Sequence, residues 1–167
     1  MDYKKALGLH VFFEKDVKPI ILENLEYHQR NIAHARQIVN ETRRQNLQDE
    51  ESAEYIKVYL GELKFSLTGA KCYTHMHNKD YENGVKYYEL FKILCYKRIE
   101  DTDIDEVIQG KNNYTNEFAY IKLCNSVKEE LEEIETIIKF LPQLKNVSVI
   151  LKAGRKMNKR KNKNNKA

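Results

Sequence analysis

Residues 49–77, DEESAEYIKVYLGELKFSLTGAKCYTHMH, carry the pattern that decides the fold. Apolar or small side chains recur there at alternating spacings of three and four residues: Ala53, Ile56, Leu60, Leu63, Leu67, Ala70, Thr74 and His77. Because a helical turn contains 3.6 residues, this spacing places them on one face of a helix. The pattern continues for about 25 residues, or roughly 38 Å of helix. Asp49, Glu50 and Glu51 precede it, where negative charge favours a helix N-terminus.

Two segments upstream show the same rhythm. A short stripe consists of Tyr3, Ala6, His10, Phe13 and Val17, and a longer one of Ile21, Leu25, His28, Ile32, Ala35 and Val39. Pro19 lies between them, where it begins a helix or kinks one, and Asp16 is a candidate cap for a helix that starts there. The sequence leaves open whether these are two helices or one kinked helix.

Two long helices are expected downstream. Residues 81–99 are apolar on more than one face, which predicts the most buried helix of the protein. The last long stripe consists of Tyr120, Cys124, Val127, Leu131, Ile134, Ile138 and Leu141. Pro142 should end that helix or kink it.

Short polar turns connect these segments. Asp80 is a candidate cap after the turn at 78–80, and residues 103–110 have the capping signals of a short helix. We therefore expect an all-α, antiparallel (up-down) bundle of four to five main helices with a short connecting helix. A parallel coiled-coil oligomer is the competing architecture, and the short turns argue against it.

Composition favours a protein inside the cell. No apolar run approaches the roughly 20 residues of a membrane-spanning helix. The N-terminus lacks the pattern of a signal peptide, and three widely spaced cysteines suit reduced thiols better than disulfides. We expect a cytoplasmic protein, or a nuclear one if the host is eukaryotic.

Charge divides the chain into two parts. Residues 1–151 form the expected bundle domain and hold 21 Lys and Arg against 25 Asp and Glu. Residues 152–167 form a basic segment without acids, which we expect to be a flexible, disordered tail because it has almost no apolar side chains. Its basic residues are Lys152, Arg155, Lys156, Lys159, Arg160, Lys161, Lys163 and Lys166. Such a segment binds DNA or RNA non-specifically by releasing counterions. The alternatives are an acidic protein or membrane surface, or a solubilising extension without a partner.

Residues 30–34, RNIAH, resemble the catalytic signature of HEPN ribonucleases. Those enzymes are helical bundles in which an Arg precedes a His by five residues, whereas His34 follows Arg30 by four. The resemblance implies acid–base chemistry at a phosphate. A spacing of four also places both side chains on one helix face, as it does on any exposed helix.

Other motifs have structural explanations. His28 and His77 lie in apolar stripes and are expected to be core or seam-edge residues, because a metal site needs three or four converging ligands. Residues 101–106 begin like a calcium loop but lack its Gly, so we expect helix capping. Residues 79–91 resemble the second helix of a tetratricopeptide repeat without a second copy. We expect no metal and no cofactor.

The sequence thus predicts a non-enzymatic helical protein that binds nucleic acid through residues 152–167. Two alternatives stay open: an adaptor that contacts a protein partner or itself through its helical seams, and a HEPN-like ribonuclease.

Overall fold

The computed structural model describes residues 1–46, 48–100 and 117–166, with the side chains of all of these except residues 117–120. Most of the described residues are helical and none of them lies in a strand, which confirms the all-α bundle. Within the described residues the α-helices are α1 (Tyr3–Phe12), α2 (Lys18–Arg44), α3 (Glu50–His77), α4 (Tyr81–Glu100), α6 (Glu117–Phe140) and α7 (Val147–Asn164). The expected capping motifs and short helix at residues 101–110 lie outside the described residues.

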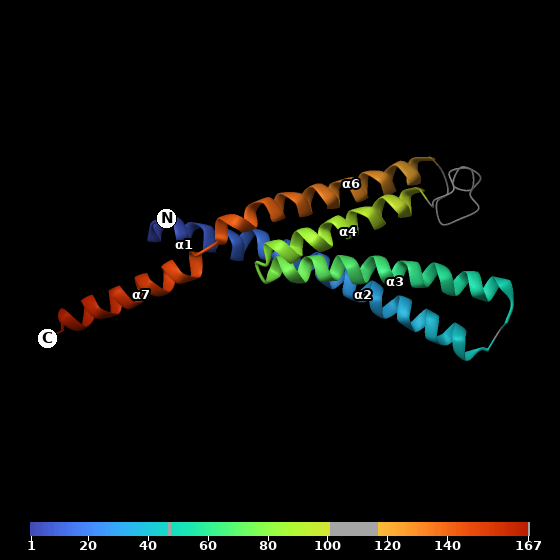
Figure 1. Cartoon of the computed structure of the whole chain (residues 1–167), viewed down its shortest axis with the longest axis horizontal. Helices are drawn as coiled ribbons and strands as arrows, with labels where there is room; N and C mark the ends of the chain where they lie inside the picture. The colour runs from blue at the N-terminus through green and yellow to red at the C-terminus, as the bar shows by residue number, and fades with distance from the viewer. Residues whose placement is uncertain (47, 101–116, 167) are drawn as a thin grey trace.

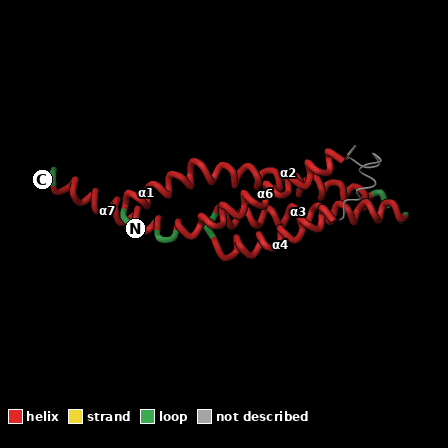
Figure 2. The backbone as a smooth tube through the Cα atoms, turned by 90° about the horizontal axis from the view of Figure 1, so that it is seen from above, coloured by secondary structure: helices red, strands yellow, loops and turns green. Residues whose placement is uncertain are grey.

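The long helices run up and down. The chain passes along α2, returns along α3, turns back along α4 and returns again along α6 (Figure 1). Helix α7 leaves this body at the end where the N-terminus lies, and it extends beyond it (Figures 1 and 2). The C-terminus therefore stands well away from the bundle.

The N-terminal helices form one continuous rod. A single π-helical turn, η1 (Phe13–Val17), joins α1 to α2, and Pro19 lies in the first turn of α2. A proline ring clashes with the carbonyl four residues earlier in a regular helix, and a wider turn is one way to relieve that clash. The open choice between two helices and one is thus resolved as one rod. Asp16 does not cap α2, whose start has no side-chain cap.

Local signals placed the ends of three helices correctly. The Asp49 carboxylate accepts a 2.7 Å hydrogen bond from the Ser52 N–H at the start of α3. At the start of α4, the Asp80 carboxylate accepts one of 3.2 Å from the Asn83 N–H. Helix α6 ends before Pro142, which lies in the 3-10 turn η2 (Leu141–Leu144). The predicted Asp80 cap, the predicted acidic start of α3 and the predicted effect of Pro142 are confirmed.

The predicted inner face of α3 is wrong. Leu60, Ala53 and Thr74 are exposed, and the residues of α3 that are buried form a different stripe: Phe65, Ser66, Gly69, Cys72, Tyr73 and Met76. Helix α3 has apolar side chains on two faces. The face with the larger aromatic rings and the small residues between them packs against α2 and α4, because the glycine there allows a close approach.

Helix α4 is not the most buried helix. Its inner face holds Tyr88, Phe91 and Cys95, but Leu90 and Ile93 on its outer side are 45% and 63% exposed. Helices α3 and α6 cover only part of the circumference of α4. The apolar residues on its several faces therefore did not predict its burial correctly. In contrast, α6 buries Val127, Leu131, Ile134 and Ile138 from the predicted stripe, and Ile137 beside them.

The expectation of a disordered tail from Lys152 is also corrected. Helix α7 passes through Gly154 and continues to Asn164, so most of the segment expected to be disordered is helical. Gly154 lies against the ring of Tyr3 in α1, and a Cβ at position 154 would overlap that ring. Buried Val147 and Leu151 fix the first turns of α7, and the Lys and Arg residues that follow have good helix propensity.

Candidate functional site

Helix α7 carries a one-sided stripe of positive charge. Six of the eight predicted residues recur at spacings of three and four, as positions on one helix face do: Lys152, Arg155, Lys156, Lys159, Arg160 and Lys163. We call these six residues the basic stripe. Lys161 lies on the other side of the helix, and Lys166 follows its end. The structure thus brings together six of the predicted residues and separates two from them.

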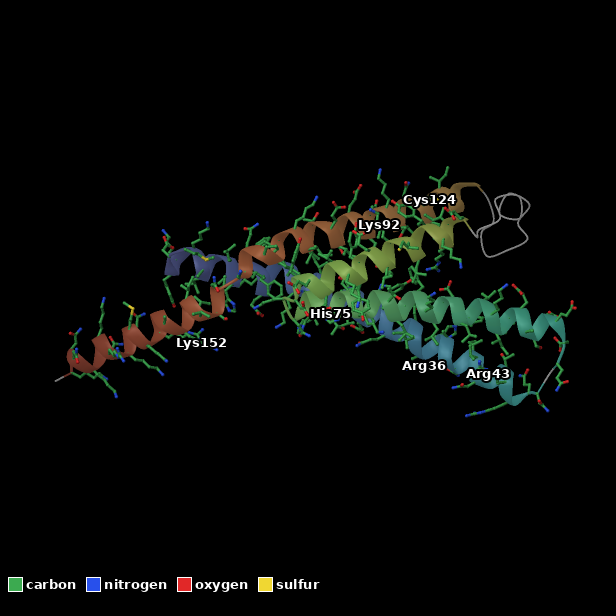
Figure 3. All side chains as sticks on the ribbon, viewed as in Figure 1. Arg36, Arg43, His75, Lys92, Cys124 and Lys152 are labelled. Atoms are coloured by element: carbon green, nitrogen blue, oxygen red, sulfur yellow. The ribbon has the colours of Figure 1, made fainter. Side chains whose placement is uncertain are left out.

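The basic stripe faces away from the surface that packs. Val147, Ile150, Leu151 and Gly154 turn toward the bundle, with Tyr3 lying on Gly154. From Arg155 to Lys166 every side chain is exposed. In Figure 3, Lys152 lies near the end of α7 that adjoins the bundle, and side chains extend from the rest of the helix into solvent. The cations are therefore accessible to a large ligand along most of the helix.

A small cleft lies where α7 meets the bundle, and it contains two basic residues that sequence reasoning missed. The cleft has a volume of about 190 Å³, and Lys152 and Arg155 of the basic stripe line it together with His10 and Lys79. His10 comes from α1 and Lys79 from the turn between α3 and α4. No sequence signal joins them, because only the packing of α7 on α1 brings these segments together.

A larger groove of about 760 Å³ opens between the far ends of α2 and α3. Its charged lining is acidic, namely Glu41, Asp49, Glu51 and Glu54. Asp49 is occupied in capping α3, and Glu41 accepts a 3.0 Å hydrogen bond from the Gln37 side chain. Neither contact indicates a ligand.

His28 is a structural residue of the core. Its ring is fully buried between the aromatic rings of Phe65, Tyr73 and Phe91. Its Nε2 lies 3.2 Å from the Glu130 carboxylate of α6, to which the Tyr73 hydroxyl also donates at 3.2 Å. Burial, reinforced by the negative charge of Glu130, raises the pKa of Tyr73 well above its ordinary value, so the hydroxyl remains a donor. Among the described residues no three His, Cys, Asp or Glu side chains are grouped to hold a metal ion.

The residues of the ribonuclease resemblance lie on the surface of α2. The Arg30 guanidinium is 3.7 Å from Glu26, with both side chains about 70% exposed. His34 is exposed and lies edge-on to the Tyr59 ring, at 6.1 Å between centroids. Neither residue lines either of the two clefts.

Two of the three cysteines are core residues. Cys72 and Cys95 are fully buried, and burial raises the pKa of each thiol to about 12. They behave as small apolar side chains rather than nucleophiles.

Comparisons with known proteins add no family: no family model, no curated protein and no solved structure matches this chain. Within the described residues, none of the helices combines the length and the apolar character needed to cross a bilayer.

Proposed function

We propose that this protein binds nucleic acid non-specifically through the basic stripe of α7. The single observation that carries the proposal is the placement of six cations on one exposed helix face without an acidic residue in that segment. A body with more acidic than basic residues up to position 151 presents this helix at one end. Local positive charge of this density attracts polyanions even when the rest of the surface does not.

The dimensions of the stripe suit a phosphate backbone. From Lys152 to Lys163 the helix rises by about 17 Å, and double-stranded DNA carries one negative charge per roughly 1.7 Å of its axis. Long, flexible lysine and arginine side chains can reach several phosphates along that length. Asn and Lys dominate this part of α7, and its sequence has no aromatic ring to stack on a base. Affinity should therefore depend on charge and salt, with little dependence on sequence.

The first test compares two nearby lysines on opposite sides of α7. Lys159→Gln removes one charge from the basic stripe, and Lys161→Gln removes the same charge from the other side. Binding to fluorescent single- and double-stranded oligonucleotides is measured between about 50 and 200 mM salt. We expect Lys159→Gln to weaken binding more and to reduce the salt slope by about 0.9 on double-stranded DNA.

Equal effects of the two substitutions would show that net charge alone matters and that the helical face does not. Deletion of residues 155–167 should abolish binding at about 200 mM salt while leaving the buried Val147 and Leu151 in place. Unchanged affinity after this deletion would overturn the proposal.

An adaptor function is the second candidate, and exposed apolar side chains on α4 favour it. Leu90, Ile93 and Tyr96 are 45%, 63% and 52% exposed. Association through them should be insensitive to salt and lost on Ile93→Lys. Leu131 of the predicted α6 stripe is buried in the core, so replacing it would test the stability of the protein and not its association with a partner.

A further inference from the structure

The cleft at the base of α7 is an unexpected concentration of positive charge. Lys79, Lys152, Arg155 and His10 line it, and none of the described residues that line it is acidic. The four side chains come from three separate segments of the chain. Its volume of about 190 Å³ is large enough for a phosphate group with part of its hydration shell.

Lys79 occupies a backbone position that usually belongs to glycine. Helix α3 ends with the Lys79 N–H bonded to the Met76 carbonyl at 3.0 Å and the Asp80 N–H bonded to the His75 carbonyl at 2.9 Å. This termination requires a left-handed residue at position 79, and Lys79 has a φ of 59°. A side chain with a Cβ is unfavourable there, and residues held in such conformations cluster at functional sites.

The side chain of Lys79 also has a defined direction. Its Nζ lies 4.7 Å from the centre of the Phe13 ring, so the side chain lies back over the N-terminal rod. Lys79 and His10 are close enough to Glu14 to help lower the pKa of its carboxyl, although the hydrogen bond from Lys18 is the main cause. Because Glu14 is already paired with Lys18 at 3.0 Å, its charge is partly balanced outside the cleft.

The cleft continues the basic stripe. Lys152 and Arg155 belong to both, so a ligand that follows the stripe toward the bundle reaches Lys79 and His10 next. Lysine and arginine residues that line one cleft from separate segments favour an anion with several acceptor oxygens, and charge-assisted hydrogen bonds of this kind are the strong ones. Phosphate meets that requirement.

We infer that this cleft binds a phosphate group. The source of this phosphate group rests on the proposed function: it is a backbone phosphate of the nucleic acid that lies along α7. A free phosphate compound offers the same chemistry, and the experiment separates the two sources.

The experiment uses the full chain and three variants. Lys79→Gln removes the cation and keeps the Cβ, whereas Lys79→Gly also relieves the left-handed backbone. The matched control is Lys128→Gln, which removes an exposed lysine of α6 that lies more than about 20 Å along the helix from Leu144. Thermal unfolding of all variants verifies that each is folded, and Lys79→Gly should be no less stable than Lys79→Gln.

The first arm titrates inorganic phosphate and follows the backbone amides of Ser148 and Lys152 by NMR. We expect saturable shifts in the wild type and in Lys128→Gln, and about tenfold weaker binding in both Lys79 variants. The second arm measures single-stranded oligonucleotide binding against salt. There, the Lys79 variants should lower the slope by about 0.7, and Lys128→Gln should leave it unchanged.

The outcomes distinguish this inference from the proposed function. Absence of saturable shifts, or equal phosphate affinity in the Lys79 variants, would overturn the phosphate site even if oligonucleotides still bind through α7. Lys79-dependent phosphate binding without oligonucleotide binding would uphold the site for a free phosphate compound and refute the proposed function. Loss in both arms on substitution of Lys79 would support both.

Discussion

Gly69 should be one of the positions of α3 least tolerant of a larger side chain, although it lies in the middle of a helix. A Cβ placed at this position lies 2.8 Å from Cε1 and Nε2 of His28 and 2.9 Å from Cε2 of Phe91. Ordinary contacts of a Cβ begin at 3.4 Å, so at least one ring must move. Both rings are fully buried, and the Nε2 of His28 is held at 3.2 Å from Glu130.

The expected magnitude follows from two opposing effects. Replacement of a helical glycine by alanine gains up to about 1 kcal/mol in helix propensity. Overpacking a dense core costs about 1–3 kcal/mol, and weakening the contact of His28 with Glu130 costs about 1 kcal/mol more. Gly69→Ala should therefore lower the free energy of unfolding by about 1–3 kcal/mol.

The same helix provides the control. Gly61 is exposed, and a Cβ placed there would have nothing within 4 Å, so Gly61→Ala should raise the free energy of unfolding by about 0.5–1 kcal/mol. Urea denaturation followed by circular dichroism measures both variants, and the midpoints are compared at equal m-values.

Equal or greater stability of Gly69→Ala relative to Gly61→Ala would refute the packing argument. If Gly69→Ala is destabilising, a double-mutant cycle with His28 identifies whether overlap with that ring is the cause. In a His28→Ala background one of the two rings is gone and the Phe91 ring can move into the space it leaves, so Gly69→Ala should lose most of its cost.

Three further predictions concern single side chains. Ser66→Ala should raise the free energy of unfolding by about 1 kcal/mol in urea titrations, since its buried hydroxyl finds no hydrogen-bond partner among the described residues; a loss of stability would contradict this. Ellman's reagent at about pH 8 should label the partly exposed Cys124 in the native protein, and should label Cys72 and Cys95 only after unfolding, because burial raises the pKa of both to about 12. Hydrogen bonding to a backbone N–H lowers the pKa of Asp49 below its ordinary 3.8, so its carboxylate stabilises the fold above that pH, and this contribution disappears as the pH falls through the lower folded value. Asp49→Asn should make thermal stability less dependent on pH between about 4 and 2, and an unchanged profile would count against the cap.

The sequence by itself determined several local features of this protein. Asp49, Asp80 and Pro142 act on backbone groups within four residues, so their effects on helix ends could be inferred from the chain. The helical spacing also sufficed to predict an up-down bundle, because amphipathic segments joined by short turns have few other ways to bury their apolar faces. The six cations of the basic stripe were also identified from the sequence. Their segment was predicted to be disordered from its composition, whereas their spacing of three and four residues fits the helix that the structure shows.

Only the tertiary structure decided which faces meet. Helix α3 offers two apolar faces, and the choice between them depends on whether Gly69 can lie against His28 of another helix. The apolar outer side of α4 is exposed because no described helix covers it. Lys79 joins Lys152 because α7 packs against α1, a contact between residues far apart in the chain. Such contacts depend on the shapes of two surfaces at once, and neither segment specifies them alone.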